Sequence, residues 1–322
     1  MQHILISRTD AIGDVVLTLP VCGLIKKHIP SAKISFLGNS YTKEVISACK
    51  YVDNFINYND WTENDEQAIL QLKKLNIDTI IHVFPKHKIA YIAQKAGIAT
   101  RIGTTNRVYH WLYCNSLIKL SRKNSDLHEA QLNIKLLKGV GIDITPKLND
   151  IPQYYGLSNL APLNEEFENL LSKEKFNLII HPKSSGSAKE WSLERYSQLI
   201  KSLDLTKFKI FISGSAKEKD VLTNWIKEHE GLVENITGRF TLSQLLTFIS
   251  KADGLVAAST GPVHLAAAVG INALGLYPNS SSINAKRWAP IGSKASYIQA
   301  ENGNINNIKP ELVLKVISSW KK

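Results

Sequence analysis

Short apolar segments rich in β-branched residues alternate along this chain with longer segments whose apolar residues recur at helical spacing. This alternation is typical of βαβ units, in which helices connect parallel strands. A first series predicts strands at His3–Ser7, Lys33–Leu37, Phe55–Tyr58, Thr79–Phe84 and Leu117–Leu120. The helices expected between them are Asp14–His28, Tyr41–Cys49, Asn64–Lys74, Ile89–Ala96 and His128–Lys138.

A second series follows a loop rich in proline, asparagine and glycine around residues 147–164. Its predicted strands are Asn177–His181, Lys207–Ser213, Gly254–Ala258, Ala273–Tyr277 and Ala295–Gln299. Its predicted helices are Leu193–Ser202, Lys217–Glu228, Leu242–Ile249, Val263–Val269 and a final helix over Pro310–Trp320. The simplest α/β assembly is two doubly wound, Rossmann-like domains, residues 1–155 and 156–322, with a cleft between them. In such sheets ligands bind where strands lead into helices.

Composition narrows the class of protein. The chain has 322 residues, 44% hydrophobic and 21% charged, enough for two globular cores. Its net charge of +11 indicates an anionic partner. The three cysteines are scattered and lack metal-binding spacing, so we expect a reducing cytosolic compartment, with no disulfide framework and no metal. The first residues do not resemble a signal peptide, and the uncharged residues 254–285 contain too many polar residues for a bilayer span.

The loop after the first predicted strand carries Arg8, Thr9, Asp10 and, at the start of a helix, Asp14. It has one glycine, so it matches neither a dinucleotide-binding fingerprint nor a Walker A loop. Two interpretations of Asp14 remain open: a carboxylate that complements the helix dipole, or a catalytic base.

The segment S-T-G-P-V-H-L-A-A-A-V-G begins at Ser259, directly after a predicted strand. Its proline suits a first helical turn, and Gly261 lets a ligand approach the backbone. The N–H groups of that turn would bind an anion, with Thr260 and His264 as further donors. A phosphate-bearing ligand is favoured over a merely capped helix with a buried histidine.

Two further loops follow strands of the second series. His181–Ser192 supplies Ser184, Ser185 and Lys189, and a lysine there would stabilise a leaving diphosphate. The alternative is a solvated loop that ends in a helix cap. In the next loop, Gly214 precedes Glu218, which is either a ligand of ribose hydroxyls or an ordinary surface residue.

No acidic residue occurs between Thr79 and Ser125, although Lys86, Arg101 and Arg107 lie there with several aromatic residues. We expect a basic patch in the first domain. Its partner would be an anionic lipid, a phosphorylated sugar acceptor or single-stranded nucleic acid. Nucleic acid ranks last, because no nucleic-acid motif accompanies the patch.

These motifs together resemble the glycosyltransferase family that contains the ADP-heptose:lipopolysaccharide heptosyltransferases, over almost the whole chain. The segment I-S-R-T-D-A-I-G-D-V-V-L-T-L-P from Ile6 resembles the opening of that family. R-I-G from Arg101, H-E-A-Q from His128 and K-E-W-S from Lys189 are also similar, and S-T-G-P-V-H is the most specific match. Family members commonly carry an acidic residue where this chain has Ser259, which leaves the donor sugar open.

The resemblance implies a GT-B fold and an inverting, metal-independent sugar transfer from a nucleotide sugar, ADP-linked in that family, to a lipid-linked saccharide at the cytoplasmic face of the inner membrane. It implies Asp14 as the base and Lys189 as the catalytic cation. The donor contacts that we expect are Ser184, Ser185, Lys189, Gly214, Glu218, Ser259, Thr260, Gly261 and His264. The acceptor contacts that we expect are Arg8, Thr9, Asp10, Lys86, Arg101, Arg107 and His128.

Two other functions fit these motifs less well. A nucleotide-sugar epimerase would use the same architecture and need no acceptor. A non-catalytic protein that binds anionic glycolipid would ignore added nucleotide. Turnover of a nucleotide sugar without acceptor, and calorimetry with nucleotide, would separate them.

Overall fold

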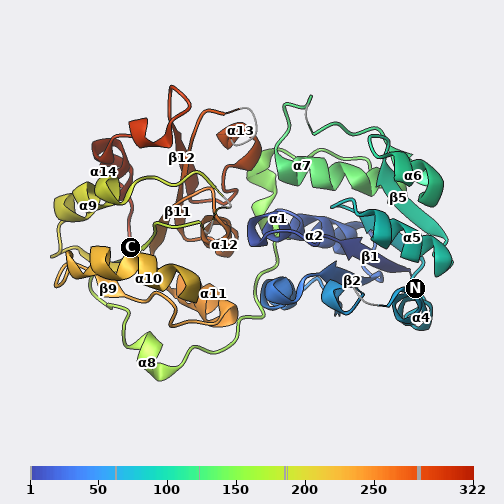
Figure 1. The fold of residues 1–322 in the computed structure, drawn as a ribbon, viewed down its shortest axis with the longest axis horizontal. Coiled ribbons are helices and arrows are strands. Elements are labelled where there is room, and N and C mark those ends of the chain that lie inside the picture. The colour runs from blue at the N-terminus through green and yellow to red at the C-terminus, as the bar shows by residue number, and fades with distance from the viewer. Residues whose placement is uncertain (1, 62–63, 123, 185, 187, 281–283) are drawn as a thin grey trace. The chain divides into compact units, whose positions relative to one another are not determined.

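The computed structural model describes the chain except residues 1, 62–63, 123, 185, 187 and 281–283. It divides into two compact units, Met1–Asn159 and Leu160–Lys322. Each unit is a parallel six-stranded sheet with helices on both faces (Figure 1). The α/β class expected from the alternating pattern is therefore confirmed.

Unit 1 contains a sheet with the strand order β3-β2-β1-β4-β5-β6. Its strands are β1 His3–Ser7, β2 Lys33–Gly38, β3 Asn54–Asn57, β4 Thr79–His82, β5 Thr100–Thr104 and β6 Ser116–Ile118. Its α-helices are α1 Ile12–Val16, α2 Leu19–His28, α3 Lys43–Ser47, α4 Asp65–Lys74, α5 His87–Lys95, α6 Val108–Tyr113 and α7 Glu129–Ile134. This is the doubly wound order in which the chain reverses direction across the sheet between β1 and β4.

Unit 2 repeats that topology, with the strand order β12-β11-β10-β7-β8-β9. Its strands are β7 Phe176–His181, β8 Phe208–Ile212, β9 Glu234–Asn235, β10 Gly254–Ala258, β11 Asn272–Tyr277 and β12 Ala295–Gln299. Its α-helices are α8 Glu165–Glu168, α9 Leu193–Ser202, α10 Ala216–Lys227, α11 Leu242–Lys251, α12 Gly261–Val269, α13 Ala285–Trp288 and α14 Pro310–Ser318. The corresponding reversal lies between β7 and β10.

The central strands are buried along their whole length, which explains their continuous apolar sequences. One expected helix differs in the structure, and several short elements were not expected. The helix expected over Asp14–His28 is two helices, because Pro20 has no N–H to donate to the carbonyl of Val16. The strand β5 and the helix α6 were not expected, because T-R-I-G-T is not an apolar run and α6 spans less than two turns.

Residues 156–159 belong to unit 1 because their backbone is bonded to the end of α3. Lys50 donates to the Gly156 carbonyl at 2.8 Å, and Ser158 and Asn159 donate to the Ala48 carbonyl at 3.1 and 3.0 Å. These contacts place the division after Asn159, whereas the sequence suggested residue 155. None of the helices in the described part of the chain has the length and apolar character needed to cross a membrane.

Candidate active site

Three of the four loops singled out in the sequence lie at the two topological switch points, and the fourth, with Gly214 and Glu218, follows β8. In unit 1, β1 and β4 are neighbours, and the loop Arg8–Asp14 follows β1. In unit 2, β7 and β10 are neighbours, with His181 paired in register with Ala257. Diverging helices leave a crevice at the carboxyl ends of such strand pairs, where doubly wound proteins bind ligands.

The backbone of the first loop is fastened to the segment that follows β2. Asn39 donates from its side-chain amide to the Thr9 carbonyl at 2.8 Å, and the Tyr41 hydroxyl donates to the Asp10 carbonyl at 2.6 Å. The hydroxyls of Ser7 and Thr9 are buried and have no hydrogen-bond partner among the described residues. A buried hydroxyl without a partner is costly, so these two groups are suited to a ligand.

Arg8 is the centre of a cluster of charges. Its side chain is only 3% exposed, and its guanidinium contacts Asp10 at 2.7 Å, Glu129 at 3.3 Å and the carboxylate of Asp14. Burial disfavours the charged form, but the three carboxylates outweigh that cost and raise the pKa of Arg8. The cation is therefore permanent and holds the Asp14 carboxylate in one orientation.

Asp14 and Asp10 are the accessible members of this cluster. Their side chains are 20% and 21% exposed, so an incoming hydroxyl group can reach them. Burial raises the pKa of Asp10 to about 6, Arg8 opposes that change, and the nearby charge of Asp14 adds to it. The arrangement supplies a carboxylate that can accept a proton beside a fixed cation.

The motif H-E-A-Q has a structural explanation. His128 is buried and caps α7: its Nδ1 accepts from the Ala130 N–H at 3.2 Å, and Gln131 completes a capping box. Glu129 is also buried, and its carboxylate forms ion pairs with the guanidinium groups of Arg8 and, at 2.9 Å, Arg122. The sequence predicted His128 as an acceptor contact and did not single out Glu129. The position of Glu129 within the H-E-A-Q motif was the signal that could have identified it.

Besides Arg8, the three other cations expected to contact an acceptor have different placements. Lys86 precedes α5, and its ammonium lies 4.2 Å from the centroid of the Tyr58 ring. Burial lowers the pKa of Lys86, and the charge of Asp10 opposes this, so Lys86 lies within electrostatic range of the first loop. Arg107 is exposed at the start of α6.

Arg101 is placed differently. It lies near the amino end of β5, whereas the candidate loops leave the carboxyl ends. Its guanidinium donates to the carbonyls of Tyr113, at 2.7 Å, and Ile98. The expected basic patch is thus smaller than the sequence suggested, because Arg122 is paired with Glu129 and Lys88 with Asp65.

In unit 2, the helix α12 begins at Gly261 with Pro262 in its first turn. Its first N–H groups have no partner within the helix, which is the general basis of anion binding at such a site. Thr260, the N-cap residue, is 4% exposed, and its hydroxyl has no hydrogen-bond partner in the described part of the chain. Ser259 lies close to the Tyr277 hydroxyl, which donates to the Trp288 carbonyl at 2.5 Å, and His264 is buried in the same helix.

The loop after β7 is held by Glu190. Its carboxylate accepts from the Ser184 N–H at 2.8 Å and hydroxyl at 2.9 Å, and it pairs with Lys183. Burial raises the pKa of Glu190, but the hydrogen bonds from Lys183 and Ser184 outweigh burial and hold that pKa below its ordinary value. Lys189 is exposed and, within the described ranges, forms no ion pair. Ser185, another expected contact, lies outside the described residues.

Glu218 is buried at the start of α10. Its carboxylate accepts from the Ser215 N–H at 2.7 Å and hydroxyl at 2.9 Å, which makes a capping box. A Cβ added to Gly214 would lie 3.2 Å from Leu222, 3.3 Å from Thr237 and 3.4 Å from that carboxylate, so the glycine lets its loop pack closely on α10. The alternative of an ordinary surface residue is wrong.

His181 brings these loops together, although the sequence did not single it out as a contact. Its Nδ1 lies 2.9 Å from the Ser213 hydroxyl, at the end of β8. Burial lowers its pKa, and the charges of Glu218 and Glu190 oppose this, which places both carboxylates within electrostatic range of the ring. The loops after β7 and β8 therefore meet around one imidazole.

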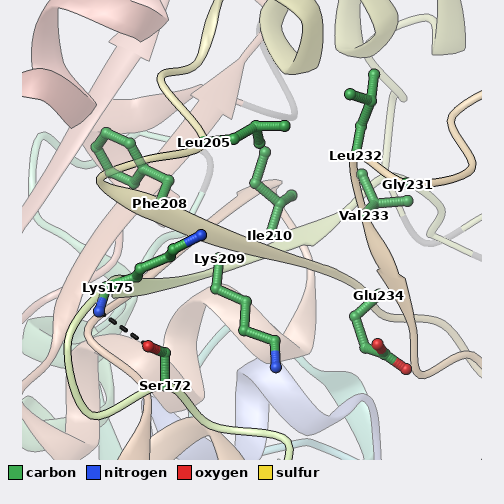
Figure 2. Close-up of a pocket in the computed structure, with 10 residues that line it drawn as sticks. All are labelled: Ser172, Lys175, Leu205, Phe208, Lys209, Ile210, Gly231, Leu232, Val233 and Glu234. Carbon is green, nitrogen blue, oxygen red and sulfur yellow. Dashed lines mark hydrogen bonds between the residues drawn. The ribbon is translucent and has the colours of Figure 1, made fainter.

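A cavity of about 560 Å³ lies elsewhere in unit 2 (Figure 2). Its walls include Phe208, Lys209 and Ile210 from the amino end of β8, and the segment 231–234 before and within β9. The candidate loops leave the opposite ends of these strands.

Two doubly wound units of identical strand order are the architecture of the GT-B fold. The model of glycosyltransferase family 9 (heptosyltransferase) matches residues 67–317. The chain belongs to that family and is a glycosyltransferase, which decides against the epimerase and the non-catalytic protein.

Individual proteins agree with the family match. A Haemophilus influenzae protein described as a glycosyltransferase is 28% identical, over 99% of this chain and 98% of that protein. The lipopolysaccharide core heptosyltransferase OpsX of the same organism is 24% identical, over 86% of this chain and 79% of OpsX. The solved structure of Escherichia coli ADP-heptose lipopolysaccharide heptosyltransferase II has a TM-score of 0.78 and 20% identity, covering 99% of this chain and 98% of that one.

Proposed function

We propose that this chain transfers a heptose from ADP-heptose to a lipopolysaccharide core or a related lipid-linked saccharide, with inversion at the anomeric carbon. Unit 1 binds the acceptor and unit 2 the donor. One observation carries the proposal: an accessible carboxylate, Asp14, follows the first strand of one switch point, and an anion-binding helix start with the unpartnered Thr260 hydroxyl follows a strand of the other.

The donor half of the proposal rests on unit 2. The first N–H groups of α12 and the Thr260 hydroxyl would receive the diphosphate, and the exposed Lys189 would add a positive charge. Glu218, held beside Gly214, would accept a ribose hydroxyl. Similarity to ADP-heptose-dependent and lipopolysaccharide heptosyltransferases supports the choice of donor and acceptor.

The acceptor half rests on the Arg8 cluster. Asp14 would take the proton of the acceptor hydroxyl as its oxygen forms a bond to the anomeric carbon. The bond between that carbon and the diphosphate oxygen breaks at the same time, and the diphosphate leaves with the electron pair. Arg8 would keep the Asp14 carboxylate aimed, while Thr9, Asp10 and Lys86 would bind the saccharide. Arg107, exposed above the same edge, would meet an anionic group of the acceptor.

We propose that the transfer needs no metal ion, because Lys189 and the start of α12 can balance the charge of the leaving diphosphate. The lipid-linked acceptor would place the reaction at the cytoplasmic face of the inner membrane.

The variant Asp14→Asn tests the base. We expect transfer to fall below about a tenth of the wild-type rate, because an amide cannot accept the proton. Calorimetry should show ADP binding nearly unchanged, since Asp14 is not part of the donor half. Transfer above that level would contradict the role of Asp14, and loss of transfer in EDTA would contradict the metal-free reaction.

A panel of donors tests the substrate. ADP-linked sugars should raise the melting temperature of the wild-type protein, because a ligand stabilises the folded state that binds it. UDP- and GDP-linked sugars should leave the melting temperature unchanged. The reverse result would contradict an ADP-linked donor.

A further inference from the structure

The helix α6 has an unusual distribution of residues. In most surface helices the apolar residues face the core, but in V-Y-H-W-L-Y the only buried residue is His110. Val108, Trp111 and Leu112 are 83%, 63% and 66% exposed. Positions separated by three and four residues share one face of a helix, so these three form a continuous apolar surface.

This surface is firmly held in place. The Trp111 indole N–H donates to the Thr105 carbonyl at 3.0 Å, and Gln94 of α5 donates to the Leu112 carbonyl at 3.1 Å. On the inner side, Tyr113 packs edge-on against His87 and Tyr91, with ring centroids 5.2 and 5.8 Å apart. Figure 1 shows α6 beside α5 at the periphery of unit 1. The exposed residues are therefore not consequences of a frayed end.

The charged residues in the part of the sequence that contains α6 all have one sign. Arg107, at the start of α6, is exposed, and so are Lys95 at the end of α5 and Lys119 after β6. The Lys95 ammonium lies 5.7 Å from the centroid of the Tyr91 ring, which packs on α6. No acidic residue occurs in the sequence from Thr79 to Ser125.

An exposed apolar face with a tryptophan and a border of cations matches the surface of an anionic bilayer, in which indoles prefer the interface and cations meet phosphate headgroups. We propose that Val108, Trp111 and Leu112 insert into the membrane interface, with Lys95 and Lys119 on anionic headgroups. A protein partner would instead have to carry acidic residues that match the cations around this face.

The role of this docking rests on the proposed function. The helix α6 begins at the edge of the sheet from which the first loop leaves. The strand β5 ends at Thr104, and α6 starts at Val108 after a short turn. Docking of α6 would hold the Arg8–Asp14 loop near the membrane surface, where a lipid-linked saccharide is presented.

The test compares the variant V108S/L112S with wild type in flotation with vesicles of phosphatidylglycerol and phosphatidylcholine in equal parts. Both side chains are exposed, so the fold should be kept, and Trp111 keeps its hydrogen bond. We expect binding of the variant to be weaker by at least about tenfold. The control V221S/L312S removes two similarly exposed apolar residues, 61% and 50%, from unit 2 and should bind as wild type does.

The variant K95Q/K119Q and added salt test the cations: both should weaken binding to these vesicles, and wild type should bind poorly to phosphatidylcholine alone. Wild-type vesicle binding that equals that of V108S/L112S would overturn the proposal. Self-association of wild type that V108S/L112S abolishes, without vesicle binding, would also overturn it in favour of a second copy.

Failure of the proposed function would be seen separately. Transfer to a deacylated lipopolysaccharide core in solution should be the same in V108S/L112S and wild type, while transfer to vesicle-embedded acceptor should fall. If no transfer occurs with either acceptor, the proposed reaction fails, but the flotation result still decides whether α6 binds membranes.

Discussion

His82 is a buried residue whose effect on the free energy of unfolding depends on pH. It ends β4, its side chain is fully buried, and neither ring nitrogen has a hydrogen-bond partner among the described residues. Its ring lies 5.6 Å from that of His110. Burial, with smaller contributions from the charges of His110 and Arg101, lowers the pKa of His82 to about 3.

This pKa predicts loss of stability in acid. Between pH 6.5 and about 3 the unfolded chain binds a proton at His82 that the folded chain does not, so the free energy of unfolding falls as the pH falls through that window. At pH 5 the loss from this group is about 2 kcal/mol. The variant His82→Leu should lose that component, as measured by urea unfolding at pH 7 and pH 5.

The variant His28→Leu provides the control. His28 is exposed at the end of α2, so this variant should keep the pH dependence of the wild type. An unchanged pH dependence in His82→Leu would show that other groups cause the acid sensitivity.

At the scale of elements, the candidate donor-binding residues Glu218 and Thr260 lie at helix starts that the sequence predicts. The sequence predicted the helices near Glu218 and Thr260, because their first turns carry ordinary capping and proline signals. It did not decide whether each signal serves the helix or a ligand. The structure shows that the Glu218 carboxylate caps α10, while the Thr260 hydroxyl has no partner within the described residues.

The variant Glu218→Gln separates capping from donor binding. Glutamine also completes a capping box, so the free energy of unfolding should stay within about 0.5 kcal/mol of wild type. The KM for the ADP-linked donor should rise several-fold, because an amide accepts ribose hydroxyls less strongly than a carboxylate does. An unchanged KM would restrict Glu218 to its structural role. Lys219→Gln, one residue further along the same helix, is the matched control.

At the scale of the whole molecule, the two units share one strand order but present different side chains in the loops after their strands. Unit 1 concentrates carboxylates around Arg8, and unit 2 presents hydroxyls, backbone N–H groups and Lys189. The net charge of +11 first indicated an anionic partner. The basic residues behind it lie in both units, and some of them form internal ion pairs, as Arg122 does with Glu129.

Hydrogen exchange on the full chain tests this division of labour. Added ADP should slow exchange in residues 183–191 and 260–264 of unit 2, because bound phosphate engages their N–H groups. The segment 8–14 of unit 1 should change little. Protection confined to unit 1 would reverse the assignment of donor and acceptor. Adenosine, which lacks phosphates, is the control and should protect residues 260–264 less than ADP does.

The sequence by itself determined the α/β class, most of the strands and the polar loops that follow them, because buried parallel strands are continuous apolar runs and their following loops are polar. It also located Asp14 and Thr260. Only the tertiary structure decided which charges from distant segments meet. Glu129 reaches Arg8 across 121 positions of sequence, and the same packing directs Arg101 to internal carbonyls and leaves the apolar face of α6 exposed.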